Sequence, residues 1–150
     1  RAGLALERLV PDPADEAVVK AAIKRCKAAQ QMHVTSAAGT DLHITLAGAR
    51  NAGVWGWSDR PGMLAHWPGG LVVNFPKAGS VNGRLVLDAG DINLTFKRYL
   101  EKPIALHIEH DHIETIEGQG LDADLMRSYI AACGDRSACR LAAGYVRGHS

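Results

Sequence analysis

A series of short apolar runs, separated by turns rich in Gly, Pro and Asp, constrains the fold of this chain most strongly. The runs "MHVTSAA" and "DLHITLA" flank the turn signal "GTD", and "GLVVNFP" and "GRLVLDAG" follow further along. Alternating or continuous apolar stretches of this length are typical of strands, and short turns between them favour antiparallel pairing. We predict one mixed, mainly antiparallel sheet with strands near 32–38, 41–48, 70–76 and 83–88 and a hairpin over 104–116.

Two helical segments flank these strands. In "DPADEAVVKAAIKRCKAAQQ", Asp12 suits the N-cap and Pro13 the first helical position, so we predict a helix near 13–31. "GLDADLMRSYIAAC" predicts a second helix near 121–133. The expected class is therefore α+β, in one domain of 150 residues. Its parts are a helical lead-in (1–31), a sheet-rich core (32–117), the helix 121–133 and a tail (134–150).

Composition and charge exclude several functions. The formal net charge is +1 and no basic run occurs, so a nucleic-acid partner is not expected. No apolar stretch is long enough to span a membrane, and no membrane association is expected. Cys26, Cys133 and Cys139 form no CxxC pair, which favours reduced thiols in a cytoplasmic protein.

The segment "HIEHDHIE" (107–114) has the composition of a metal site but the pattern of a hairpin. Strand alternation directs His107 and Glu109 away from the core, and a turn near His110–Asp111 returns the chain. His107, Glu109, His112 and Glu114 would then lie on or near the solvent face, without the dry cavity and orienting partners that a catalytic metal requires. We predict an exposed hairpin here and no metal ligands.

The segment "GVWGWSDRPGMLAHWPGGLVVNFP" contains all three tryptophans in a loop punctuated by Gly and Pro. Aromatic side chains on loops above a sheet are typical of ligand pockets, although large tryptophans also serve as ordinary core residues. Asp59 and Arg60 are expected to pair with each other or to lie at the rim. No catalytic residue is predicted, because Ser36 and Ser58 have no recognisable base beside them. The predicted ligand-binding residues are Trp55, Trp57, His66 and Trp67.

At "AGTDLHITL", "GWSDRPG…HWPGG", "FPKAGSVNGRLVLDAGDINLTFK" and "GLDADLMRSY" the chain resembles the 2,5-dihydroxypyridine 5,6-dioxygenases. It is similar, more distantly, to the metallo-aminopeptidases typified by aminopeptidase T. The resemblance implies the start of the C-terminal α+β catalytic domain of that fold. In those families an N-terminal α/β domain precedes this region and further chain follows it.

The resemblance also implies where functional residues would fall, and most of these positions differ here. Leu71 stands where the aminopeptidases carry a metal-binding Glu; the dioxygenases carry no carboxylate there, so this difference argues only against peptidase chemistry. Val54 stands where the dioxygenases carry a pocket carboxylate. A further ligand would fall near Ala143, unless a longer loop allows His149 to replace it, and an HxD pair would follow this sequence. Of the polar pocket residues, His66 has a clear counterpart. We therefore predict no cofactor and no stoichiometric iron or zinc.

Three interpretations remain open. The chain is a repurposed, metal-free, non-catalytic relative that binds a peptide or small molecule, as an accessory protein in a biosynthetic pathway. Alternatively, it is part of a longer iron(II)-dependent dioxygenase that cleaves a hydroxylated aromatic ring such as 2,5-dihydroxypyridine. In the third, it is an interaction module that pairs through sheet edges. Self-association or a partner chain is expected in any of the three.

Overall fold

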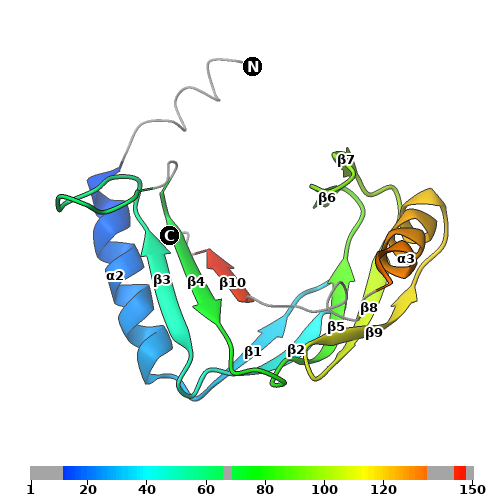
Figure 1. The fold of residues 1–150 in the computed structure, drawn as a ribbon, viewed down its shortest axis with the longest axis horizontal. Helices are drawn as coiled ribbons and strands as arrows, with labels where there is room; N and C mark the ends of the chain where they lie inside the picture. Colours follow the sequence, from blue (N-terminus) through cyan, green and yellow to red (C-terminus); the bar gives the residue numbers. More distant parts are fainter. Residues whose placement is uncertain (1–11, 66–68, 135–143, 148–150) are drawn as a thin grey trace. The chain divides into compact units, whose positions relative to one another are not determined.

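The computed structural model describes residues 12–65 and 69–134, and the backbone of 144–147 (Figure 1). The chain divides into two compact units. The first unit contains α2 (Pro13–Ala28), β3 (Arg50–Val54), β4 (Leu71–Phe75) and β10 (Gly144–Arg147). The second contains β1 (Gln31–Thr35), β2 (Asp41–Thr45), β5 (Asn82–Leu87), β6 (Ile92–Asn93), β7 (Arg98–Tyr99), β8 (Ile104–Glu109), β9 (His112–Glu117) and α3 (Leu121–Cys133). The single-domain organisation stays a prediction.

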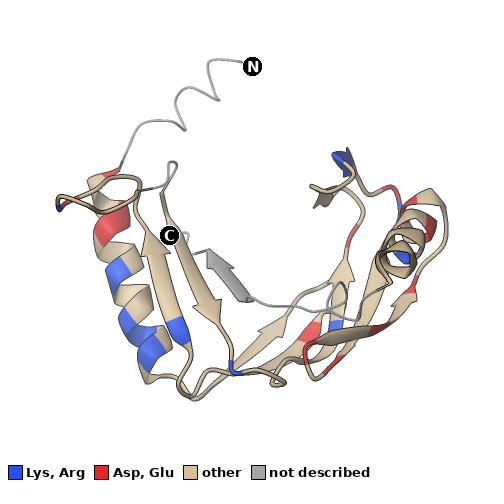
Figure 2. Cartoon of the chain, in the orientation of Figure 1, with Lys and Arg blue, Asp and Glu red and all other residues tan. Residues whose placement is uncertain are grey.

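In the first unit, α2 packs on a three-stranded antiparallel sheet of order β10-β4-β3. The Asp12 carboxylate accepts a hydrogen bond from the Ala14 N–H at 2.9 Å and caps the helix. Figure 2 shows acidic residues at the start of α2 and basic residues toward its end, which complements the helix dipole. Gly53 lets the helix approach β3 closely, because a Cβ there would lie 2.5 Å from side-chain atoms of Val19 and Ile23.

The second unit is built on a five-stranded antiparallel sheet of order β1-β2-β5-β8-β9. Alternation gives this sheet an apolar face, which includes the buried residues Leu42, Ile44, Leu106 and Ile108. The helix α3 contacts β9. The small β6–β7 hairpin is tied to α3 by the ion pair of Arg98 Nε with Asp122 Oδ1, 2.7 Å apart.

The α+β class is confirmed, but the prediction of one continuous sheet is wrong. The strand expected near 70–76 is β4, and it pairs with β3 and β10 in a separate sheet. Its partner β3 has the sequence "RNAGV", which is poor in the β-branched and aromatic residues that indicate strands. The close approach of α2 explains the glycine at position 53, since a larger side chain there would collide with the helix. The first helix begins as predicted and ends three residues early, at Ala28.

The hairpin predicted over 104–116 is confirmed as β8 and β9. His110 and Asp111 form its two-residue turn with φ angles of 48° and 73°. Positive φ at both central residues is the geometry that matches the twist of the flanking strands. The sequence of the turn is therefore unusual, because Asn and Gly are the residues that adopt this conformation at least cost.

Candidate functional site

Trp55 and Trp57 lie directly after β3 and line one small cavity in the first unit. The cavity has a volume of about 30 Å³. Both indole side chains are half-buried. Gly69 packs closely against the backbone of this segment and leaves no room for a side chain, because a Cβ on Gly69 would lie 2.3 Å from the Trp55 carbonyl carbon. The remaining lining residues are Gly53, Val54, Met63, Leu64 and Ala65.

Two of the four predicted ligand-binding residues are thus brought together. His66 and Trp67 lie outside the described residues, so their part in the site stays a prediction. A cavity of 30 Å³ admits a group the size of water rather than a ring. Met63 and Leu64 are exposed, at 38% and 81%, and a ring-sized ligand requires these side chains to move.

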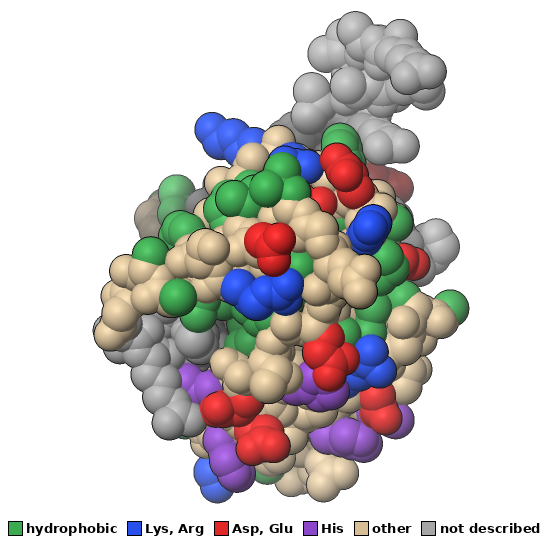
Figure 3. All heavy atoms as spheres, turned by 90° about the vertical axis from the view of Figure 1, so that its right-hand side faces the viewer, with side chains coloured by type: hydrophobic (Ala, Val, Ile, Leu, Met, Phe, Trp, Pro, Cys, Tyr) green, Lys and Arg blue, Asp and Glu red, His purple; other side chains and the backbone are tan. Residues whose placement is uncertain are grey.

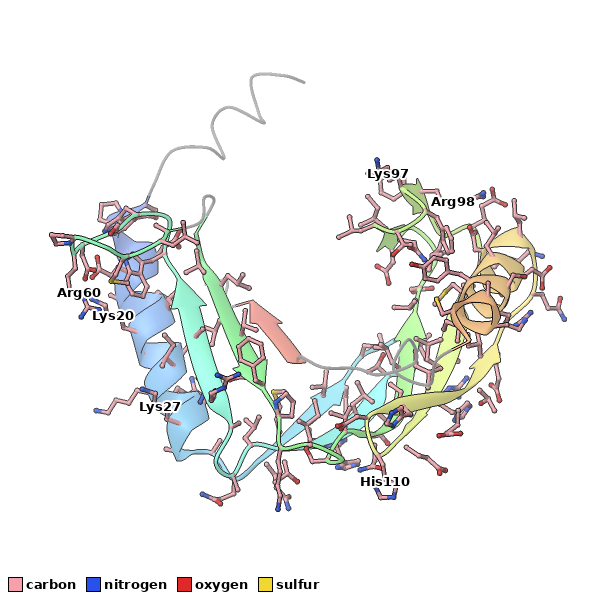
Figure 4. The ribbon with its side chains drawn as sticks, in the orientation of Figure 1. Lys20, Lys27, Arg60, Lys97, Arg98 and His110 are labelled. Atoms are coloured by element: carbon pink, nitrogen blue, oxygen red, sulfur yellow. The ribbon has the colours of Figure 1, made fainter. Side chains whose placement is uncertain are left out.

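The polar groups beside this cavity come from α2 and from the loop after Trp57. Lys20 Nζ lies 5.0 Å from the ring centre of Trp55, in a cation–π contact. The Trp55 Nε1 atom is buried and has no hydrogen-bond partner among the described residues. Arg60 Nε lies 3.6 Å from Asp59 Oδ1, so the expected pairing of these two residues is confirmed. Asp59 also lies 3.9 Å from Lys20 Nζ, and Figure 4 shows Lys20 and Arg60 on the same side of the first unit.

The two positions where relatives are expected to carry carboxylates lie opposite each other across β3 and β4. Val54 pairs with Leu71 in the strand register. Both side chains are apolar, so this pair supplies neither a metal ligand nor an acid or base. The described residues of the cavity offer apolar indole surface and one indole N–H donor, which is binding chemistry rather than proton transfer.

The three histidines of residues 107–114 have separate partners within the second unit. His107 Nε2 lies 3.1 Å from Glu117 Oε1, and His112 Nδ1 lies 2.9 Å from the carbonyl oxygen of His110. His110 lies at the tip of the β8–β9 hairpin and points away from the sheet (Figure 4). The segment is a hairpin, as predicted, and its imidazoles do not converge.

The buried charged residue in this segment is Asp111, for which sequence analysis predicted only a place in the turn. Its side chain is 4% exposed and accepts hydrogen bonds from the N–H groups of Gly79 (2.6 Å) and Val81 (2.9 Å). The His110 N–H donates to Asn82 Oδ1 at 2.9 Å. The turn is therefore docked on the "GSVNG" segment, which gives that distinctive stretch a structural role.

Sequence analysis also missed a set of residues that do converge, namely His33, Asp41 and His43. Alternation within "MHVT" and "DLHIT" already places these side chains on one face of the predicted hairpin. The missing information was the register, which sets His33 directly opposite His43. Among the described residues, these three side chains form the group of His, Cys, Asp or Glu residues whose ligand atoms all lie within 4.8 Å of one another.

The described architecture, antiparallel sheets with flanking helices, matches that of two solved structures. A 2,5-dihydroxypyridine dioxygenase from Pseudomonas putida superimposes with a TM-score of 0.84 at 37% identity, covering 92% of this chain and 40% of that chain. Aminopeptidase T (AmpT) from Thermus thermophilus superimposes with a TM-score of 0.67 over 93% of this chain and 35% of that chain. At 22% identity, this second likeness shows the fold alone.

Sequence comparison extends the likeness from fold to family. The sequence pattern of the family described as 2,5-dihydroxypyridine 5,6-dioxygenase matches residues 3–143. The 2,5-dihydroxypyridine 5,6-dioxygenase of Pseudomonas putida is 40% identical over 125 residues, which cover 83% of this chain. The chain belongs to the 2,5-dihydroxypyridine 5,6-dioxygenase family, and the expected resemblance is confirmed. It spans 35% of the length of that curated relative.

Two further observations concern the setting of the protein. Within the described residues, none of the helices has the length and apolar character required to cross a membrane. Cys26 and Cys133 are free thiols, and Cys139 lies outside the described residues.

Proposed function

We propose that this chain forms the ring-binding part of a dioxygenase that acts on a hydroxylated pyridine, and that Trp55 and Trp57 hold the ring. The observation that carries the proposal is that the two predicted aromatic residues line one cavity in a chain 40% identical to a 2,5-dihydroxypyridine 5,6-dioxygenase. His66 and Trp67 are proposed to complete the site.

The chemistry of the cavity suits such a ligand. Indole rings offer rigid apolar area for stacking on a flat heteroaromatic ring. The buried Nε1 of Trp55, which lacks a partner among the described residues, can donate to a ring hydroxyl or ring nitrogen. Donating to the ligand would remove the cost of leaving this N–H unsatisfied. Lys20 covers one face of Trp55, so the ligand would contact the opposite face or the edge.

Iron(II) is the cofactor expected if the chain is part of a longer dioxygenase. The described residues beside the tryptophans do not fit this metal, because the apolar side chains of Val54 and its strand partner Leu71 offer no ligand atom. Ala143 and His149 lie outside the described residues. We therefore assign ring binding to the described residues and derive no iron-dependent step from them.

A second candidate is a repurposed relative that binds a peptide or small molecule without metal or catalysis, as an accessory protein in a cytoplasmic biosynthetic pathway. The apolar side chain of Val54 favours it, since the resemblance implies a pocket carboxylate at this position. The third interpretation, pairing through sheet edges, keeps a structural basis in β1 and β9, which are the edge strands of the five-stranded sheet.

Quenching of tryptophan fluorescence by 2,5-dihydroxypyridine tests the proposal. We expect saturable quenching by the wild-type chain and binding weakened by about tenfold or more in Trp57→Ala, equivalent to about 1.4 kcal/mol. Trp55→Phe, which keeps the ring but removes the N–H, should show a smaller loss. Lys27→Ala, an exposed substitution on α2, is the matched control and should bind as wild type. Unchanged affinity in both tryptophan variants would refute a ring site here.

Two accompanying measurements separate the alternatives. Thermal melting distinguishes a pocket tryptophan from a core one, because truncating a core Trp to Ala should cost roughly 3–5 kcal/mol of unfolding free energy. Oxygen consumption with added Fe²⁺ and 2,5-dihydroxypyridine distinguishes the two candidate functions. Oxygen uptake with ring opening supports the dioxygenase. Binding of 2,5-dihydroxypyridine without oxygen uptake, measured on a protein extended to the length of its relatives, supports the repurposed, metal-free relative.

A further inference from the structure

The β1–β2 hairpin carries a second candidate site, which lies in the second unit and does not depend on the proposed function. His33 in β1 and His43 in β2 are direct partners in the strand register. Asp41 precedes His43 by two residues, so its side chain emerges on the same face of the sheet. This face is the one opposite Leu42 and Ile44, which are buried. We call His33, Asp41 and His43 the hairpin cluster.

The two imidazoles converge on one carboxylate oxygen. His33 Nε2 lies 2.6 Å and His43 Nε2 lies 3.3 Å from Asp41 Oδ1. The two rings stack with centres 4.3 Å apart and planes inclined by 12°. The side chains are exposed by 53%, 63% and 67% for His33, Asp41 and His43. An ion can therefore reach all three ligand atoms directly from solvent.

We propose that the hairpin cluster binds one divalent late first-row transition metal ion, Zn²⁺ or Cu²⁺, through two imidazole nitrogens and one carboxylate oxygen. Imidazole is a preferred ligand of both ions, and the carboxylate adds a negative charge. Metal–ligand bonds of about 2.0–2.2 Å place neighbouring tetrahedral ligands roughly 3.3 Å apart. Asp41 and His43 already have this separation. His33 must withdraw from Asp41 by less than about one ångström, and its exposure makes that movement inexpensive.

The surroundings of the hairpin cluster favour metal binding over a simple ion pair between its own side chains. The strand register holds the three Cα atoms in place, so ordering is limited to side-chain rotations. A shallow groove of about 650 Å³, lined in part by Asp41, His43, Gly83 and Arg84, adjoins the cluster. The groove leaves room for the water molecules that complete the coordination of an ion with three protein ligands. Figure 3 shows histidines among acidic and basic side chains at the lower end of one face.

The expected site is a binding site and not a catalytic one. It has three protein ligands, lies in solvent and has no dry cavity around it, so the ion should exchange readily. It also uses none of the residues at which the resemblance implies metal ligands. Protein purified without added metal can therefore lack stoichiometric iron or zinc and still bind added Zn²⁺ at the hairpin.

Calorimetric titration of the untagged, chelator-treated chain with ZnCl₂ and CuCl₂ tests the assignment. We expect one ion per chain, with Cu²⁺ bound more tightly than Zn²⁺. His33→Ala and His43→Ala should each weaken binding by about tenfold or more, and Asp41→Asn should also weaken it. His112→Ala, which removes a histidine outside the cluster, is the matched control and should bind as wild type.

NMR of the wild-type chain keeps the test independent of how well the variants fold. Zn²⁺ should shift and broaden the imidazole resonances of His33 and His43 and leave those of His107, His110 and His112 in place. The proposal is overturned if the wild type shows no saturable binding. It is equally overturned if the His33→Ala/His43→Ala double variant binds as wild type, or if Zn²⁺ perturbs the histidines of residues 107–112 instead.

Discussion

In the segment 107–114, histidines that are close in sequence do not converge in the structure, whereas the hairpin cluster brings together residues that are farther apart in sequence. The first places three histidines within eight residues, yet the structure directs them to separate partners. The second takes His33, Asp41 and His43 from two strands and brings their ligand atoms within 4.8 Å. In a sheet, alternation and register determine which side chains meet, so the density of ligand residues along the chain is a poor guide to a metal site.

The aspartates of the two regions differ in their burial and in their partners. Asp111 is buried in the β8–β9 turn and accepts two backbone N–H groups of residues 79–81. Asp41 is exposed and faces two imidazoles. The first carboxylate therefore stabilises the fold, whereas the second is available to a ligand.

Removing Asp111 should produce the largest effect. Asp111→Ala is expected to lower the free energy of unfolding by about 3 kcal/mol, because hydrogen bonds to a charged acceptor are worth about 1.5–3 kcal/mol each and two N–H donors lose their partner. Chemical denaturation monitored by circular dichroism measures the loss. Asp111→Asn keeps one oxygen acceptor and should be intermediate.

Asp41→Ala is the matched control for this comparison, because it removes the same carboxylate from an exposed site. The midpoint of its denaturation curve should stay close to that of the wild type. Equal destabilisation by Asp41→Ala and Asp111→Ala would contradict the division between a structural and an accessible aspartate.

The conformation of the turn predicts a smaller effect. His110→Val should lower the free energy of unfolding by about 1–2 kcal/mol, since a β-branched residue is strained at the φ of 48° found there. His112→Val, two residues on in β9, should leave stability unchanged or slightly raised, because β-branched residues suit strands. Equal stability of His110→Val and His112→Val would argue against a positive φ at His110.

Much of the fold could be predicted from sequence where a local pattern determines the element. Helix α3 has the predicted bounds, and the hairpin at residues 110–111 follows from alternation on either side of a turn. Strand β3 could not be predicted, because it is poor in β-branched and aromatic residues and its Gly53 serves the close approach of α2. The separation of β4 from the five-stranded sheet depends on that same missed strand.

The candidate sites also differ in how much of them a local sequence pattern could predict. Trp55 and Trp57 could be selected from composition because aromatic residues in a Gly/Pro loop are unusual, and the structure places both on one cavity. The size of that cavity could not be foreseen, since it depends on Met63 and Leu64. The hairpin cluster required the pairing of His33 with His43, which no single-strand pattern contains.

The titration of Asp41 should give the smallest effect and the finest test of the cluster's geometry. The hydrogen bond with His33 is the main cause that holds the pKa of Asp41 below its usual value of 3.8, and the charges of His33 and His43 act in the same direction. A carboxyl group with a lowered folded-state pKa contributes stability above its unfolded pKa and loses it as the pH falls through the folded one. The loss of stability is therefore confined to pH values below 3.8. NMR titration of the Asp41 carboxyl carbon in metal-free protein should give a midpoint below 3.8.

His33→Ala should move the midpoint back toward 3.8, and His43→Ala should move it less, because His43 lies farther from the carboxylate, at 3.3 Å against 2.6 Å. A midpoint that does not respond to His33→Ala would show that the two side chains are not in contact in solution.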